Sequence, residues 1–163
     1  MKRLDAVVPI YDEAEILPEL NRRLRGVLAG LDFDWRVIYV DDGSRDGSGE
    51  MLAGLAEEHD RVCVVHLSRN FGQQAAIAAG LAMADADAVV LLDGDLQDPP
   101  EVIPDLVDRW REGYDVVYAV KRKRKEGWLK RMMFAAFYRV LGAVSSIEIP
   151  ADAGNFSLMD RSV

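Results

Sequence analysis

Three aspartates follow one another closely where an apolar run of the sequence ends. The stretch "LLDGDLQDPP" places Asp93, Asp95 and Asp98 after aliphatic residues and before two prolines. Mg²⁺ or Mn²⁺ takes oxygen ligands, commonly one or two carboxylates together with substrate phosphate oxygens, and Gln97 offers a further, neutral oxygen. The stretch predicts a divalent-metal site with Asp93, Asp95 and Gln97 as ligands. The simpler alternative is a solvated acidic turn.

Two other polar segments also follow apolar runs. Asp41 and Asp42 end the run in "IYVDDGSRDGS", and Pro9, Tyr11 and Glu13 stand at the end of another in "VVPIYDEAEI". The two aspartates can accept hydrogen bonds from a ribose or a base, and the second group can line a slot for a planar base. The alternatives are a turn that caps a helix and a helix whose first turn carries acidic residues.

These segments belong to a chain in which apolar runs alternate with helical patterns. The expected strands cover 4–10, 35–40, 62–67, 88–92 and 114–120, and the expected helices cover 13–30, 47–58, 73–84 and 100–113. Nearly continuous apolar runs are typical of parallel strands covered on both faces. The predicted fold is therefore α/β, a Rossmann-like open, mostly parallel sheet with helices on both faces. Ligands bind at the carboxyl ends of such strands, where all three polar segments fall.

The charge of the chain is unevenly distributed. Residues 120–140 carry eight Lys or Arg against one acid, a net +7, which leaves −15 for the rest of a chain whose total is −8. The overall acidity argues against nucleic-acid binding. Aromatic and apolar residues are interleaved with the cations, so residues of about 121–144 are predicted to lie at a membrane surface as an amphipathic segment. A solvated loop beside core residues is the alternative.

Several classes are disfavoured by what the sequence lacks. Its single cysteine, Cys63, forms no internal disulfide and fits a reducing cytoplasm. The longest apolar-rich stretch spans about 13 residues, against about 20 for a membrane helix, and the N-terminus does not resemble a signal peptide. No Cys/His spacing indicates zinc, and no G-x-G-x-x-G indicates a nicotinamide site. The expectation is one domain, 1–163, at the cytoplasmic face of a membrane.

Five ordered segments resemble the catalytic domain of glycosyltransferase family 2, of GT-A type. They are "VVPIYDEAE", "VDDGSRDGS", "LSRNFGQQAAIAAGL", "LLDGDLQDPPE" and "ADAGNFSLMDR", and they extend from residue 7 to residue 161. Within the family the sequence is most similar to dolichyl-phosphate mannosyltransferases and bacterial polyprenyl-phosphate glucosyltransferases. The resemblance implies a metal-dependent, inverting enzyme that moves a sugar from a UDP- or GDP-sugar to a polyprenyl or dolichyl phosphate.

The resemblance also implies roles for individual residues. The nucleoside would contact Pro9, Tyr11, Glu13 and Asp42, with Asp41 nearby, and Asp93, Asp95 and Gln97 would hold the metal on the diphosphate. Asp152 would orient the acceptor or act as its base. Such an acceptor needs positive charge, and the basic segment offers Arg122, Arg124, Lys130 and Arg131 as candidates for binding its phosphate. Many relatives read Asp-x-Gly-Asp-Phe-Arg at the last segment. Here Asn155 and Ser157 replace the second carboxylate and the arginine.

Other functions stay open at this point. The acceptor could be a saccharide instead of a lipid phosphate. A haloacid-dehalogenase-like phosphatase also uses an Asp-x-Asp with Mg²⁺, although it leaves "VDDGS" and the basic segment unexplained. The lipid-phosphate-linked relatives usually continue with further amphipathic and membrane segments, so a truncated, non-catalytic nucleotide-binding domain is a third alternative. The oligomeric state is unspecified, with a homo-oligomer among the options.

Overall fold

A computed structural model describes residues 1–120 and 153–163 of the chain. The chain separates into two compact units. The first comprises Met1–Tyr118 and Asn155–Val163 and contains the site described below. The second comprises Ala119–Gly154, most of which lies outside the described residues.

The first 120 residues alternate between strands and helices, as the sequence predicts. In chain order the elements are β1 (Arg3–Ile10), α1 (Leu17–Ala29), β2 (Asp34–Asp41), α2 (Ser48–Glu58), β3 (Val62–His66), α3 (Gln73–Met83), β4 (Ala88–Leu91), the short 3₁₀ helix η1 (Pro100–Val102), α4 (Ile103–Arg111), β5 (Val116–Val120) and β6 (Ala153–Asp160). They form one six-stranded sheet in the order β3-β2-β1-β4-β6-β5, in which β1 pairs in parallel with β2 and β4, and β2 with β3. The predicted α/β class with a mostly parallel sheet is confirmed.

Strand β6 was not among the expected strands. It pairs antiparallel with β4, with Leu91 opposite Ser157 and Ala88 opposite Asp160, and it separates β4 from β5 in the sheet. Phe156 and Leu158 are buried, whereas their neighbours in the strand are only half-buried. This alternation is that of a strand with one buried face. The sheet is therefore mixed at this side instead of continuing in parallel.

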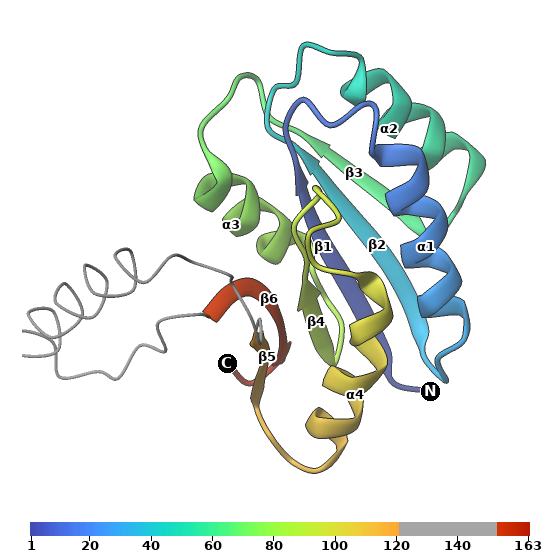
Figure 1. The fold of residues 1–163 in the computed structure, drawn as a ribbon, viewed down its shortest axis with the longest axis vertical. Helices are drawn as coiled ribbons and strands as arrows, with labels where there is room; N and C mark the ends of the chain where they lie inside the picture. Colours follow the sequence, from blue (N-terminus) through green and yellow to red (C-terminus); the bar gives the residue numbers. More distant parts are fainter. Residues whose placement is uncertain (121–152) are drawn as a thin grey trace, which may run out of the picture. The chain divides into compact units, whose positions relative to one another are not determined.

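Helices cover both faces of the sheet. Helix α3 lies on one face, and α1, α2 and α4 lie on the other (Figure 1). Right-handed crossovers account for α1 and α2 on one face and α3 on the other, because the chain runs outward from β1 to β3 and then returns to β4. Under α3 the core includes Val7, Ile38, Val40 and Leu91. A Cβ added at Gly80 of α3 would lie 2.4 Å from Val7 Cγ1, so the glycine allows the helix to pack close to the sheet.

Helix α1 begins four residues later than its pattern suggests. The amides of Ile16 and Leu17 both donate to the Glu13 carbonyl, which makes the segment from Glu13 a turn that leads into the helix. Among the residues that the structure describes, none of the helices has the length and apolar character that crossing a bilayer requires.

Candidate functional site

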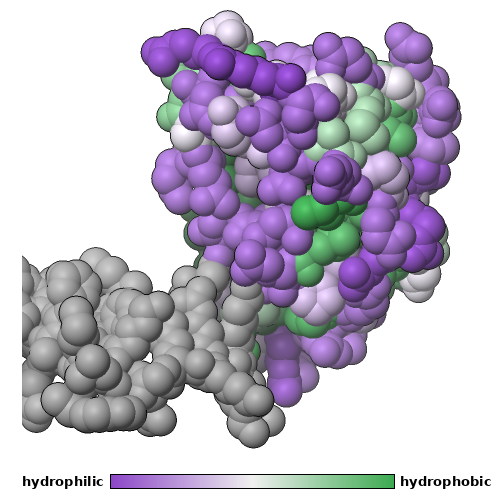
Figure 2. All heavy atoms as spheres, turned by 45° about the horizontal axis from the view of Figure 1, so that its top comes forward, coloured by the Kyte–Doolittle hydropathy of each residue, from purple (hydrophilic) through white to green (hydrophobic). Residues whose placement is uncertain are grey.

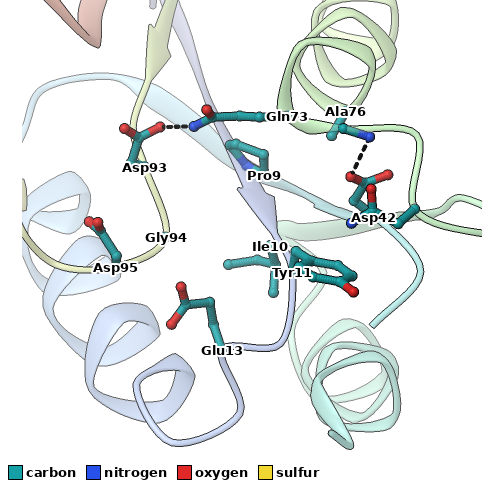
Figure 3. Close-up of a pocket in the computed structure, with 12 residues that line it drawn as sticks. Pro9, Ile10, Tyr11, Glu13, Asp42, Gln73, Ala76, Asp93, Gly94 and Asp95 are labelled. Atoms are coloured by element: carbon teal, nitrogen blue, oxygen red, sulfur yellow. Dashed lines mark hydrogen bonds between the residues drawn. The ribbon is translucent and has the colours of Figure 1, made fainter. Parts of the chain in front are cut away.

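A pocket of about 240 Å³ opens at the carboxyl ends of the parallel strands. The loops that follow β1, β2, β3 and β4 all contribute to it, as expected for this fold. Its described lining residues are Pro9, Ile10, Tyr11, Glu13, Asp42, Asn70, Gly72, Gln73, Ala76, Asp93, Gly94 and Asp95 (Figure 3). Figure 2 turns the upper end of Figure 1 toward the viewer, and the coloured surface seen there is predominantly hydrophilic.

The pocket has one end built from the loop after β4. Asp93 and Asp95 lie on one side of Ile10 in Figure 3, and Tyr11 and Asp42 lie toward the other. The Asp95 carboxylate accepts a hydrogen bond from the Gln97 amide, 2.9 Å from Oδ1, which fixes the local turn. The predicted pair of aspartates is thus brought together at one pocket wall.

Gln97, the third predicted metal ligand, is placed differently. Its side chain is exposed and is not among the described residues that line the pocket. Leu96, which precedes it, has φ of 56°, a left-handed conformation that is uncommon for a bulky residue. The role of Gln97 stays a prediction, whereas Asp93 and Asp95 both line the pocket.

Gly94, between the two aspartates, lets this loop approach β1. A Cβ at this position would lie 2.6 Å from Ile10 Cδ1 and 2.9 Å from the Pro9 carbonyl oxygen. The second of these atoms belongs to the backbone and cannot move aside easily. Any larger residue at position 94 would clash with β1. The glycine therefore allows the loop to keep both carboxylates close to the end of β1.

The two aspartates after β2 have different surroundings. Asp42 lines the pocket, and its two oxygens accept the amides of Phe71 at 2.8 Å and Gly72 at 2.9 Å. Asp41 is not among the described lining residues; it accepts the Ser44 amide at 2.9 Å and lies 3.0 Å from His66 Nδ1. Burial opposes ionisation of Asp41, but hydrogen bonds from Ser44 and His66 outweigh it, so its pKa is lowered. Asp41 therefore stabilises the loop after β2 without lining the pocket.

The loop after β2 also holds the loop after β1. Side chains of this loop and of the start of α2 accept three successive amides, those of Asp12, Glu13 and Ala14. The acceptors are Ser44 Oγ at 3.1 Å, Ser48 Oγ at 3.0 Å and Asp46 Oδ2 at 2.8 Å. In return, the Arg45 amide donates to Asp12 Oδ1 at 2.7 Å. This bonding fixes the backbone that carries Tyr11 and Glu13.

The pocket is electrostatically negative. Its described lining includes four acidic side chains, Glu13, Asp42, Asp93 and Asp95, and no Lys or Arg. The pKa of Glu13 is raised, first by burial and then by the nearby charges of Asp95, Asp46 and Asp12. Acidic groups that repel one another in this way favour a cation among them.

Burial of Glu13, together with this repulsion, predicts that Glu13→Gln stabilises the ligand-free protein at pH 7. The folded state raises the pKa of Glu13 above its ordinary value of 4.5, so folding stability is lost as the pH rises from below 4.5 through the raised pKa. Glutamine does not ionise and avoids this loss. We expect the melting temperature of Glu13→Gln to exceed that of the parent by a few degrees at pH 7 and to approach it near pH 4.

Glu15→Gln is the matched control, because Glu15 is exposed in the same loop. Thermal unfolding monitored by circular dichroism should show a smaller change for this variant at either pH. An equal gain in both variants, or a gain for Glu13→Gln that persists unchanged at pH 4, would contradict an origin in the charge of Glu13.

The residues present fit a divalent cation that is shared with a ligand. Among the described residues, no group of three or more His, Cys, Asp or Glu is arranged to enclose a metal by itself. Asp93 and Asp95 supply two carboxylates at an open pocket. Mg²⁺ is usually bound in this way, by one or two carboxylates with the remaining positions taken by substrate phosphates and water.

Two residues at this end of the pocket were not predicted as site residues. Gln73 donates from Nε2 to Asp93 Oδ1 at 2.8 Å, and Asn155 donates from Nδ2 to the same oxygen at 3.2 Å. Gln73 has no sequence signal that sets it apart from the neighbouring Gln74. Asn155 was noted in the sequence only as a departure from the family's usual aspartate, and that departure was the available signal.

The remaining predicted residues lie outside the part that the structure describes. They are the candidates for the acceptor, Arg122, Arg131 and Asp152, and the amphipathic segment of about 121–144.

Comparison with known proteins places almost the whole chain within one family. The family model described as glycosyl transferase family 2 matches residues 5–163. An uncharacterized glycosyltransferase of Synechocystis is 45% identical over 161 residues, which cover 98% of this chain and 51% of that protein. The undecaprenyl-phosphate 4-deoxy-4-formamido-L-arabinose transferase of Pseudomonas fluorescens is 44% identical over 141 residues, which cover 83% of this chain and 41% of that protein. The chain thus spans about half the length of the curated relatives that it matches.

A solved structure supports the fold independently. The mannosyltransferase of Pyrobaculum calidifontis in complex with GDP-Man and Mn²⁺ superposes with a TM-score of 0.69. The likeness covers 99% of this chain and 45% of that one, at 23% identity. At this identity the likeness concerns the fold.

Proposed function

Because this chain belongs to glycosyltransferase family 2, we propose that it binds a nucleotide sugar at the carboxyl ends of its parallel strands and transfers the sugar to an acceptor. One observation carries the proposal: Asp93 and Asp95 form one wall of the same pocket whose other side carries Tyr11 and Asp42. A diphosphate needs a cation in so acidic a pocket, and a nucleoside needs an aromatic or planar surface with polar groups beside it. The pocket offers both in one continuous space.

The nucleoside is assigned to the end formed by Pro9, Tyr11 and Asp42. Tyr11 is 44% exposed, so its ring is accessible to a planar base. Asp42 is held by two backbone amides, which fixes the direction of its carboxylate. Glu13 lies between this end and Asp95, and Asp41 acts indirectly by supporting the loop.

Asp93 and Asp95 are assigned to a Mg²⁺ or Mn²⁺ ion, with Gln97 as a further candidate ligand. Such an ion supplies positive charge that offsets the charge developing on the leaving diphosphate. The mannosyltransferase of similar fold was solved with GDP-Man and Mn²⁺, which supports a metal-dependent donor site here. Within the chain, the Gln97 amide orients the Asp95 carboxylate by donating to its Oδ1 at 2.9 Å.

The acceptor is proposed to be a polyprenyl or dolichyl phosphate. The similar Pseudomonas protein is named as an undecaprenyl-phosphate transferase, which supports this class. A phosphate monoester has a second pKa of about 6, so an acceptor oxygen is already ionised at neutral pH. That oxygen attacks the anomeric carbon as the bond to the diphosphate breaks, which inverts the configuration. Arg122 and Arg131 are proposed to bind the acceptor phosphate and Asp152 to orient it; a saccharide acceptor is the alternative.

The basic amphipathic residues of about 121–144 are proposed to contact the cytoplasmic face of a membrane. Their cations suit anionic headgroups, and their apolar residues suit the interface. Replacing Arg122, Arg124 and Arg131 with Ala should weaken binding to vesicles containing phosphatidylglycerol, measured by co-sedimentation, while nucleotide binding is unchanged. Loss of both properties together would contradict the assignment of these residues to the acceptor side alone.

The decisive test of the donor site is a ligand screen. UDP-, GDP- and dTDP-sugars are each added with Mg²⁺, with Mn²⁺ or with EDTA, and the melting temperature is recorded. A ligand that binds the folded state stabilises it by mass action. We expect one nucleotide to raise the melting temperature in the presence of metal and much less with EDTA. No stabilisation by any of them would overturn the proposed function. Release of phosphate from p-nitrophenyl phosphate would instead support the phosphatase.

A further inference from the structure

We propose that Gln73 and Asn155 are positioning residues that hold the Asp93 carboxylate in the orientation needed to bind a divalent cation. The inference rests on the proposed function, because it assigns Asp93 to that cation. Both side chains donate to one oxygen of Asp93: Gln73 Nε2 at 2.8 Å and Asn155 Nδ2 at 3.2 Å from Oδ1. Two donors from separate elements fix a carboxylate better than one, since rotation of the group would break both bonds.

The chemistry of the two donors suits this role. An amide donates a hydrogen bond without carrying a net charge. A lysine or arginine in the same place would also hold Asp93, but its charge would compete with a cation. No Lys or Arg is found among the described residues that line the pocket. Gln73 and Asn155 therefore hold Asp93 without adding charge to the pocket.

The fold explains why Asn155 reaches Asp93. In the antiparallel pair of β4 and β6, Leu91 lies opposite Ser157. Continuing this register by two residues puts Asp93 opposite Asn155, on the same side of the sheet, where directly opposed side chains interact. β6 thereby gives a polar partner to a loop that lies just beyond the end of β4. The inserted antiparallel strand has a functional consequence at this position.

Gln73 connects the same carboxylate to the other end of the pocket. It is the first residue of α3, and the preceding residue, Gly72, donates its amide to Asp42 Oδ2 at 2.9 Å. Two successive residues at the start of one helix therefore contact Asp42 and Asp93. This arrangement sets the separation of the nucleoside end from the metal end through a rigid element.

The test measures metal binding directly. The affinity of the full chain for Mn²⁺ is determined by electron paramagnetic resonance of the free ion, alone and with UDP or GDP present. Gln73→Ala and Asn155→Ala are compared with Gln74→Ala and Ser162→Ala, which change exposed residues near the start of α3 and just after β6. Because removing a partner that orients a metal ligand typically costs 10–100-fold in affinity, we expect at least about tenfold weaker Mn²⁺ binding in the first pair and less than about twofold in the controls.

The outcomes separate the two proposals. If the parent chain binds Mn²⁺ with a nucleoside diphosphate and the first pair binds it as tightly as the controls do, the positioning role is wrong and the donor site stands. If the parent chain binds neither Mn²⁺ nor a nucleoside diphosphate, the proposed function fails and this inference fails with it. Circular dichroism melts without metal distinguish lost affinity from lost folding. A selective loss of Mn²⁺ affinity at an unchanged melting temperature supports the positioning role.

Discussion

Asp95→Ala should abolish the metal-dependent part of nucleoside diphosphate binding. Asp95 lines the acidic wall of the pocket, and its charge contributes to raising the pKa of Glu13. Without it, Asp93 would be the one remaining aspartate of the proposed pair for a cation that is shared with the diphosphate. We expect the affinity for UDP or GDP in Mn²⁺ or Mg²⁺ to fall by at least about 100-fold, or about 2.7 kcal/mol, in isothermal titration calorimetry.

Asp95→Asn separates the charge from the turn. The asparagine oxygen can still accept the Gln97 amide, which lies 2.9 Å from Asp95 Oδ1, but it carries no negative charge. If charge is what matters, both variants lose binding, and Asp108→Asn on the exposed face of α4 does not. Binding that survives in Asp95→Asn would show that Asp95 acts by shaping its turn, and binding that survives in both would remove it from the site.

Gly43→Ala should be among the most destabilising single substitutions in the described part of the chain. Gly43 has φ of 71°, and an added Cβ would lie 2.5 Å from the Arg69 carbonyl carbon and 2.7 Å from the Asn70 nitrogen. A left-handed conformation costs about 1–2 kcal/mol for a residue with a Cβ. The contacts are with backbone, so the loops after β2 and β3 must separate as well. We expect a total loss of about 3 kcal/mol or more in urea unfolding.

Gly47→Ala is the control for this effect. Gly47 has φ of 96°, but an added Cβ would meet nothing within 4 Å. It should therefore incur the conformational cost of about 1–2 kcal/mol without the steric one. The difference between the two variants measures how closely the loops pack at Gly43. Equal losses would show that the contact with Arg69 relaxes freely.

The sequence predicted most of the sheet because its central strands are continuous apolar runs. Such runs indicate strands that are buried on both faces. The order of strands and helices along the chain then restricts the possible topologies of the sheet. Strand β6 was missed although Asn155, Phe156, Ser157 and Leu158 alternate between polar and apolar, the pattern of a half-buried strand. The alternation covers few residues and is preceded by a glycine, which is uncommon inside strands. Its insertion between β4 and β5 depends on contacts far apart in the chain, which local patterns do not encode.

The location of the site could be predicted more readily than which side chains point into it. Parallel strands bring their carboxyl ends together, so the convergence of Tyr11, Asp42 and Asp93 follows from the fold. Neighbouring residues at a strand end point to opposite sides, however, so only one of Asp41 and Asp42 can line the pocket. The sequence does not say which. The bonds that turn Gln73 toward Asp93 likewise depend on where α3 begins.

The hydrogen bonds around the loop after β2 have a consequence for engineering this protein. Its side chains accept amides from the loop after β1, at Asp12 to Ala14, and from the loop after β3, at Phe71 and Gly72. The three loops are therefore not interchangeable modules. Replacing one loop alone with that of a relative that prefers another nucleotide sugar would leave several backbone amides without their acceptors. Altered specificity is better sought by replacing side chains such as Tyr11 or Asn70 on an unchanged backbone, or by transplanting all three loops as one piece.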